Sequence, residues 1–317
     1  MVGSTTSVAG IDISKAHLDV ALDGRDERLR VPNTLDGCRQ LVAWLRQHGV
    51  GRVGMEASGG YERLPAEALR EAGFEVALLQ PRQVRAFAVY RLKRAKNDRI
   101  DAGLIARCTA ELDVVRAARD PRLATMDEHL RLIEQIEADV AQMKTRSEAY
   151  RDPRLQRCIA RETKRLERRL KAELALLLKT IAQHDDLVRR LRLIVSVEGV
   201  GERTALTLLI LMPELGQLSR EEAASLAGLA PFDDDTGKQR GQRHIAGGRF
   251  RVRRAVYRAA LAASFRWNPR LISLYQRLRE KGRAHKQALV ACARKLIIFV
   301  NTVLARGSEW KKEPQNA

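Results

Sequence analysis

Residues 8–15 read VAGIDISK, an apolar run interrupted by a single acid, Asp12. This pattern is typical of a buried strand that carries a functional side chain. A second run, residues 53–56, ends on Glu56. Asp98 and Asp101 follow three residues apart, so on a helix they share one face. A lone acid in a strand is usually an edge or turn residue, and the ordered set of four is therefore more informative than any one member.

Carboxylates that converge from two strand ends and one helix can hold a pair of Mg²⁺ ions around a phosphodiester. The sequence thus predicts a metal-dependent nuclease site. Its four carboxylates are Asp12, Glu56, Asp98 and Asp101.

The elements around these acids alternate between strand and helix. Thr34 is a good N-cap for the first helix. A strand hairpin followed by alternating α/β units, with an acid in the first strand, is the plan of ribonuclease-H-like domains. We expect strands at 8–13, 17–22, 27–31, 53–56 and 75–80, with helices from Thr34, at 61–72, from Pro81 and at 98–112.

The composition favours a polyanionic partner. The chain has 317 residues, with 58 Lys and Arg against 39 Asp and Glu, a net charge of +19. Such an excess suits nucleic acid, because binding releases condensed counterions. No apolar run reaches the roughly 20 residues of a membrane-spanning helix, so we expect no membrane partner.

The positive charge is concentrated in two tracts without acids. Residues 76–97 contain six cations, among them Arg94 and Lys96, and residues 236–279 contain twelve. A basic tract is often only a solvated helix face. Since each of these two tracts lies beside a candidate site, we interpret them as phosphate-contacting surfaces.

From about Met126 the pattern becomes purely helical, with a break expected at Asp152 and Pro153. The apolar spacing between Met126 and Ile181 fits either a hairpin packed on the rest of the chain or a coiled coil that dimerises. We expect three parts: residues 1–120, an α/β domain; residues 121–190, a helical coiled-coil segment; and residues 191–317, an all-α domain.

Residues 197–204, VEGVGERT, resemble the turn of a helix-hairpin-helix motif. In such a turn, glycines such as Gly199 and Gly201 let backbone N–H groups approach a DNA phosphate. Further on, residues 228–241 are polar and rich in glycine, which predicts a loop, and a basic helix follows at 252–265.

Together these motifs resemble the IS110/IS1111 family of insertion-sequence transposases. The resemblance covers essentially the whole chain and implies an RNase H/RuvC-like domain, then a helical segment and an all-α transposase domain. It is carried by residues 10–15 (GIDISK), 56–61 (EASGGY), 96–102 (KNDRIDA), 197–201 (VEGVG), 228–231 (GLAP) and 244–249 (HIAGGR).

The resemblance implies an RNA-guided recombinase that uses Mg²⁺ and a hydroxyl nucleophile. In the family, the loop after Ala-Pro normally reads Ser-Gly-Lys, and the serine is the expected nucleophile. Here that position is Thr236, which fits a working natural variant, an engineered substitution or an impaired copy. The cations expected to hold phosphates near Thr236 are Lys238, Arg240, Arg243 and Arg249. Arg251 and Arg253, at the start of the basic helix that follows, are also expected to bind nucleic acid.

The expected partners are donor and target DNA, an element-encoded guide RNA, and further copies of the chain in a dimer or tetramer. The resemblance also implies a prokaryotic, cytoplasmic and nucleoid-associated protein. Two alternatives stay open: a RuvC-type Holliday junction endonuclease that uses water, and a catalytically impaired nucleic-acid scaffold.

Overall fold

The computed structural model describes residues 7–57, 59–91, 98–115, 120–232 and 244–311, without the side chains of residues 98–101 and 232. Contacts group the chain into two compact units, residues 1–118 and 119–317.

The first unit is built on a mixed five-stranded sheet. Its order is β3-β2-β1-β4-β5, with β1, β2 and β3 antiparallel and β1, β4 and β5 parallel. This is the RNase H-like arrangement that the sequence predicts. The strands are β1 (Ser7–Ile13), β2 (His17–Leu22), β3 (Arg28–Pro32), β4 (Val50–Glu56) and β5 (Glu75–Leu79).

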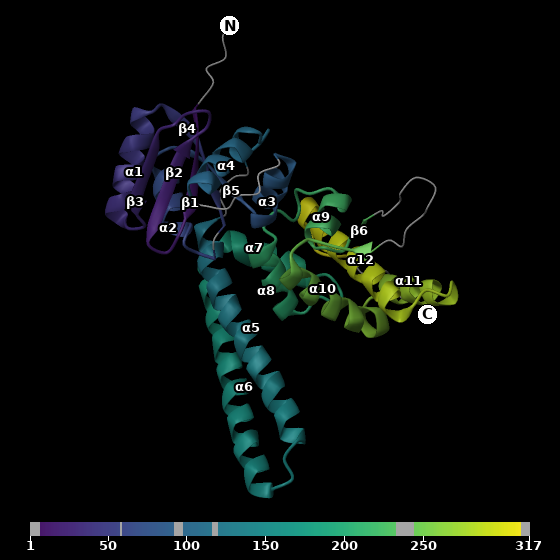
Figure 1. The fold of residues 1–317 in the computed structure, drawn as a ribbon. Coiled ribbons are helices and arrows are strands. Elements are labelled where there is room, and N and C mark those ends of the chain that lie inside the picture. Colours follow the sequence, from purple (N-terminus) through teal and green to yellow (C-terminus); the bar gives the residue numbers. More distant parts are fainter. Residues whose placement is uncertain (1–6, 58, 92–97, 116–119, 233–243, 312–317) are drawn as a thin grey trace. The chain divides into compact units, whose positions relative to one another are not determined.

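Two amphipathic helices, α1 (Leu35–Gln47) and α2 (Arg63–Glu71), cover one face of this sheet (Figure 1). Ile11 and Met55 of the sheet are fully buried there in one cluster with Leu41 of α1 and Leu69 of α2. As predicted, the Thr34 side chain caps α1, because it accepts a hydrogen bond from the Gly37 amide.

The opposite face carries α4 (Asp98–Ala110), and α3 (Pro81–Tyr90) packs beside it. Paired glycines, Gly10 of β1 and Gly54 of β4, let α4 lie directly on the strands. A Cβ atom at Gly10 would overlap the backbone of Ala102 and Ala106, and one at Gly54 would overlap the Thr109 side chain. Any larger residue would push α4 off the sheet.

The end of α4 lies over the beginning of the strands. Arg107 forms an ion pair with Asp23 at 3.5 Å, and the Asp23 amide bonds to the carbonyl of Val8, near the start of β1. Arg52, early in β4, donates to the Leu112 carbonyl just after α4 at 2.8 Å. The helix therefore runs against β1 and β4, and its first turn lies toward their carboxyl ends.

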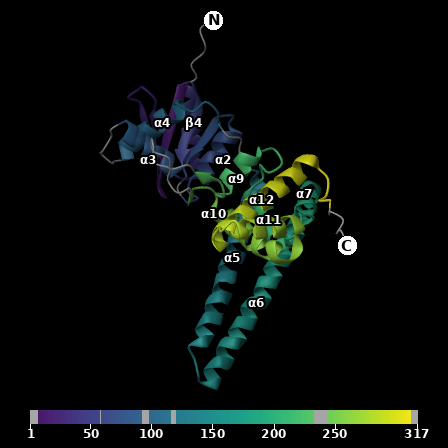
Figure 2. The same cartoon turned by 90° about the vertical axis from the view of Figure 1, so that its right-hand side faces the viewer.

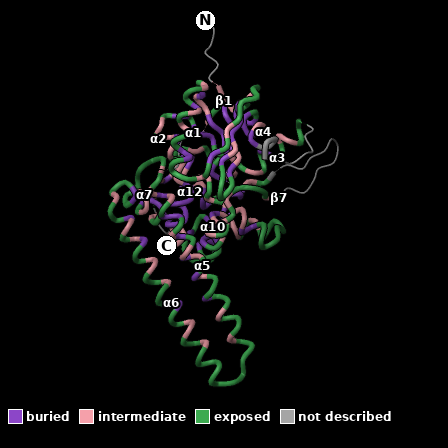
Figure 3. The backbone as a smooth tube through the Cα atoms, turned by 60° about the vertical axis from the view of Figure 1, so that its left-hand side comes forward, coloured by how far each residue is buried: buried purple, intermediate pink, exposed green. Residues whose placement is uncertain are grey.

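The second unit begins with a long helical hairpin, α5 (Pro121–Glu148) and α6 (Pro153–Ile181) (Figure 2). The predicted break is where the sequence places it: Asp152 is the N-cap of α6, and Pro153 is its first residue. The apolar seam closes within the chain, since Ile136 and Val140 of α5 pack against Leu166 of α6. Beyond this seam most of the hairpin surface is exposed (Figure 3).

The remaining helices form a single apolar core with the base of the hairpin. Every residue of α8 from Ala205 to Leu211 is buried. Arg122 ties the start of α5 to the start of α7, because it pairs with both Asp120 and Asp186, and its hydrogen bonds lower the pKa of both carboxyls. The helices are α7 (Asp185–Val195), α8 (Glu202–Leu211), α9 (Arg220–Leu226), α10 (Phe250–Ala262), a π-helical turn (Ala263–Trp267), α11 (Pro269–Glu280) and α12 (His285–Arg306).

Helix α12 corrects the expectation that no segment has the length and hydropathy of a membrane span. By length and composition its 22 residues are sufficient to cross a membrane. Buried residues such as Leu289, Leu296 and Val300 form part of the core of the second unit. This is the packing of a core helix, whose apolar surface is covered by neighbouring helices.

The glycine contact under α4 gives a stability prediction. Gly10→Ala places a methyl group against the backbone of α4, which cannot rotate away, and we expect a loss of about 1–3 kcal/mol of unfolding free energy. The matched control is Gly103→Ala within α4, where a Cβ atom would lie 3.9 and 4.0 Å from the two nearest atoms, the terminal guanidinium nitrogens of Arg28. That change should be neutral or stabilising by up to about 1 kcal/mol. Urea denaturation compares the two, and equal effects would show that α4 does not depend on the glycine contact.

Candidate nuclease site and nucleic-acid interface

Asp12 and Glu56 stand at the carboxyl ends of neighbouring strands. Ile11 and Met55 are paired in the parallel register of β1 and β4, so the residues that follow them lie side by side. Because side chains alternate along a strand, Asp12 is on the same face as Gly10, and Glu56 on the same face as Gly54. Both carboxylates thus face the side of the sheet that carries α4, and both are half-buried.

Asp98 and Asp101 belong to the first turn of α4. Their side chains are outside the described part of the structure, and only the backbone placement of this turn can be used. Since α4 runs against β1 and β4, that turn lies toward the strand ends that carry Asp12 and Glu56. The fold therefore brings together the elements that hold the four predicted carboxylates.

Asp19 is a further carboxylate on this face, and the sequence analysis missed it. It lies on β2 directly opposite Asp12 in the antiparallel register, and Arg30 pairs with it at 3.2 Å. Like charges directly across two strands repel each other, so Arg30 offsets a local excess of negative charge. The signal in the sequence is the hairpin itself, because a turn at residues 14–16 pairs Asp12 with Asp19.

The carboxylates at these strand ends suit a hard divalent cation. Carboxylate oxygens are the protein ligands that Mg²⁺ prefers, and Asp12 and Glu56 supply them from adjacent strands. Within the described side chains, no group of three or more His, Cys, Asp or Glu residues is close enough to hold a metal ion. The predicted site therefore depends on the first turn of α4 for its remaining ligands.

In the second unit, a short ribbon joins the two ends of the predicted nucleophile loop. The ribbon is formed by β6 (Pro231–Phe232) and β7 (His244–Ile245), which pair antiparallel. Within the described part of this unit, the ribbon is a departure from the expected all-α fold. Thr236, Lys238, Arg240 and Arg243 lie outside the described residues, as do Arg94 and Lys96 of the first unit.

The base of this loop is fixed by a close crossing of two glycine segments. Gly228 and Gly248 both have positive φ, and a Cβ atom on Gly248 would overlap the Gly228 backbone. Arg253 donates to the Gly247 carbonyl at 3.0 Å and to the Gly228 carbonyl at 3.4 Å. The segments before β6 and after β7 are therefore held together by backbone contact and by one guanidinium.

Arg249 and Arg251, both predicted to bind nucleic acid, have their guanidinium groups in ion pairs within the protein. Arg249 binds both oxygens of Glu214, at 2.6 and 2.8 Å. Arg251 pairs with Asp127 and with Glu134, at 2.7 Å for the latter, and so attaches α10 to α5. These partners are more than 30 residues away in the chain, and no local pattern in the sequence indicates them.

The two glycines of the predicted helix-hairpin-helix turn differ in their surroundings. The turn lies between α7 and α8, as expected. Gly199 has a φ of +92°, and a Cβ atom there would overlap Ala263 of the π-helical turn. A glycine is therefore needed at this position so that the turn can pack against Ala263. Gly201 is the N-cap of α8, and a Cβ atom there would meet no heavy atom within 4 Å. Of the two positions, Gly201 is the one that leaves room for a ligand.

The fold and the site define a class of protein. An RNase H-like sheet with carboxylates at its strand ends is followed in the chain by a helical unit that contains the short β6–β7 ribbon, and the chain is strongly basic. Comparison with protein families agrees: residues 9–152 match a transposase family whose model is named for a DEDD domain of IS110, and residues 191–276 match the transposase IS116/IS110/IS902 family. The chain belongs to the IS110 family of transposases, which implies DNA binding and the use of a divalent metal.

Similar proteins include DNA-inverting relatives. The pilin gene-inverting proteins of Moraxella bovis and Moraxella lacunata are each 24% identical over 323 aligned positions, covering 96% of this chain and 97% of theirs. The insertion element IS110 uncharacterized 43.6 kDa protein of Streptomyces coelicolor is 33% identical over 115 residues, which are 36% of this chain and 28% of that protein.

The glycine crossing at the loop base leads to a second prediction. Gly247→Ala and Gly248→Ala both force a methyl-bearing residue into positive φ, which costs roughly 1–2 kcal/mol. Only Gly248→Ala adds an overlap with the backbone of Gly228, since a Cβ atom on Gly247 meets nothing within 4 Å. We expect Gly248→Ala to lower the unfolding free energy by at least about 1 kcal/mol more than Gly247→Ala. Chemical denaturation of the two variants measures the difference, and a smaller cost for Gly248→Ala would contradict the crossing.

Proposed function

We propose that this chain is a DNA recombinase of an insertion sequence, guided by an element-encoded RNA, which cuts and rejoins strands with Mg²⁺-bound carboxylates and the hydroxyl of Thr236. The observation that carries the proposal is the placement of α4. It brings the first turn of that helix to the strand ends of Asp12 and Glu56, where four carboxylates can surround one phosphodiester.

The chemistry assigned to this chain's residues is a two-step exchange. The Thr236 oxygen attacks phosphorus, the bond from phosphorus to a deoxyribose oxygen breaks, and that oxygen leaves as a free DNA hydroxyl. A hydroxyl of another strand then attacks the phosphothreonine and releases Thr236. Because the ester bond is kept on the protein, no external nucleotide is needed.

Asp12, Glu56, Asp98 and Asp101 would hold Mg²⁺. When bound, the ion supplies charge neutralisation at the non-bridging and leaving oxygens of the phosphate. Lys238, Arg240 and Arg243 would hold phosphates beside Thr236. The ribbon and the glycine crossing support this assignment, because they fix both ends of the loop that carries all four residues.

The basic tracts support RNA guidance, with 12 cations and no acid between residues 236 and 279. A protein that leaves target choice to base pairing needs to recognise RNA shape and backbone, and only 4% of this chain is aromatic. We further propose a dimer or tetramer, because recombination cuts four strands and one chain supplies one hydroxyl. The hairpin seam is filled within the chain, so the contact between copies lies on another surface.

The proposal is tested by trapping the covalent intermediate. The chain, co-expressed with the RNA of its native element, is incubated with labelled element-end DNA and Mg²⁺, and the products are separated on denaturing gels. We expect a labelled protein–DNA adduct with the native chain and no adduct with Thr236→Ala. Thr236→Ser should keep or raise the yield, because removal of the methyl group frees the hydroxyl to rotate, and a misplacement of about 1 Å can cost on the order of 10²-fold in rate.

Thr236→Val is the matched variant, since it keeps the branched shape of the side chain and replaces only the hydroxyl by a methyl group. It should lose the adduct while its unfolding transition is unchanged. An adduct that persists in Thr236→Ala would place the nucleophile elsewhere. Metal-dependent cleavage with no adduct in any variant would identify a hydrolytic junction nuclease, and no cleavage at all would identify a scaffold.

A further inference from the structure

Helix α6 carries a stripe of cations that the proposed chemistry does not use. Their spacing alternates between three and four residues, so they share one face of the helix. All six are exposed, and the stripe is about 25 Å long at 1.5 Å per residue. The stripe consists of Arg154, Arg157, Arg161, Lys164, Arg168 and Lys171.

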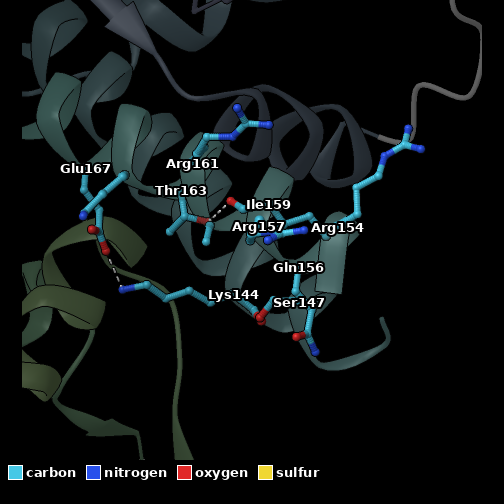
Figure 4. A pocket seen from close by; sticks show the side chains of 11 residues that line it. Lys144, Ser147, Arg154, Gln156, Arg157, Ile159, Arg161, Thr163 and Glu167 are labelled. Atoms are coloured by element: carbon cyan, nitrogen blue, oxygen red, sulfur yellow. Dashed lines mark hydrogen bonds and ion pairs between the residues drawn. The ribbon is translucent and has the colours of Figure 1, made fainter. Parts of the chain in front are cut away.

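The first part of the stripe lines a hollow at the free end of the hairpin (Figure 4). The hollow has a volume of about 770 Å³ and is lined by residues of both α5 and α6. Its only acidic lining residue is Glu167, which pairs with Lys144 of α5 at 2.8 Å. Four cations of the lining therefore remain without a carboxylate there: Arg154, Arg157, Arg161 and Lys164.

Other arginines of α6 behave differently. Arg165 pairs with Glu162 at 2.6 Å, and Arg169 approaches Glu173 at 4.0 Å. Among the residues that the structure describes, no carboxylate lies within ion-pair distance of a stripe cation. The cations of α6 thus fall into two groups: those paired with carboxylates, and those of the stripe, which share one face with other positive charges only. Within the stripe, residues four apart in the sequence, such as Arg157 and Arg161, repel each other. A polyanion would relieve this repulsion.

We propose that the stripe binds the phosphate backbone of duplex DNA, as a contact separate from the nuclease site and the Thr236 loop. Duplex DNA carries one charge per roughly 1.7 Å of its axis, so a 25 Å row of cations meets a dense line of phosphates. Single strands are usually bound with stacked aromatic side chains, and the lining of the hollow contains none. A second copy of the hairpin would bring like charges together, and the apolar seam is already filled.

This inference requires DNA binding but neither RNA guidance nor the nucleophile assigned above. The test compares two double variants of the full chain, freed of RNA, on a 30-base-pair DNA duplex of mixed sequence. Arg157→Gln with Arg161→Gln removes two stripe charges. Arg165→Gln with Arg169→Gln removes two paired charges from the same helix. Both pairs are exposed, and circular dichroism checks that α6 persists.

Binding is measured by fluorescence anisotropy between 50 and 200 mM NaCl. The slope of log affinity against log salt is negative, and we expect it to become less steep by about 1.8 in the stripe variant, or about 0.9 per lost phosphate contact, and to change little in the control. Equal slopes in the two variants would overturn the proposal. So would an equal loss of affinity for single-stranded DNA of the same length, or a loss confined to duplex RNA. The adduct assay is independent of this outcome, because it scores covalent chemistry at Thr236.

Discussion

The contact between α4 and the glycines of β1 and β4 is the constraint on which the candidate site depends. Two strands lie side by side at Gly10 and Gly54, and a helix rests on them where no side chain intervenes. Two residues further along each strand stand Asp12 and Glu56, on the same face. A helix held this close, and running against the strands, begins near their ends. The absence of two Cβ atoms thus positions carboxylate-bearing elements that are more than 40 residues apart in the sequence.

In the second unit, too, glycines allow two segments to approach closely, here at the base of the predicted nucleophile loop. Gly228 and Gly248 cross in close backbone contact, and Arg253 joins the two segments at their carbonyls. Arg251 then attaches α10 to the base of the hairpin through Asp127 and Glu134. Since Asp127 is almost fully buried, the pair is costly to break, and its loss would leave a buried charge without a partner. The segments that flank β6 and β7 are therefore held to each other, and α10 is held to α5.

Much of the fold could be predicted from local patterns. The acid in the first strand, the Thr34 cap and the Asp152–Pro153 break each have a physical signature within a few residues, and the structure confirms the cap, the break and the sheet. The long-range ion pairs could not be predicted in this way. Arg249 and Arg251 have the same charge as any phosphate-binding arginine, and only the packing of distant helices places Glu214 and Asp127 beside them. The closure of the apolar seam within one chain likewise depends on tertiary contacts. The pairing of Asp12 with Asp19, in contrast, follows from the predicted strand hairpin of residues 8–13 and 17–22. The roles predicted for Asp98, Asp101 and Thr236 stay predictions.

The convergence of β1, β4 and α4 on one metal site can be measured directly by iron-mediated cleavage. Fe²⁺ replaces Mg²⁺ in the full chain, ascorbate and peroxide generate hydroxyl radicals at the bound ion, and mass spectrometry maps the backbone cuts. We expect cuts in three places at once: near Asp12, near Glu56 and in the first turn of α4. Asp12→Asn should remove all three together. Cuts that omit α4, or that fall instead at another acidic segment such as the start of α7, would contradict the account.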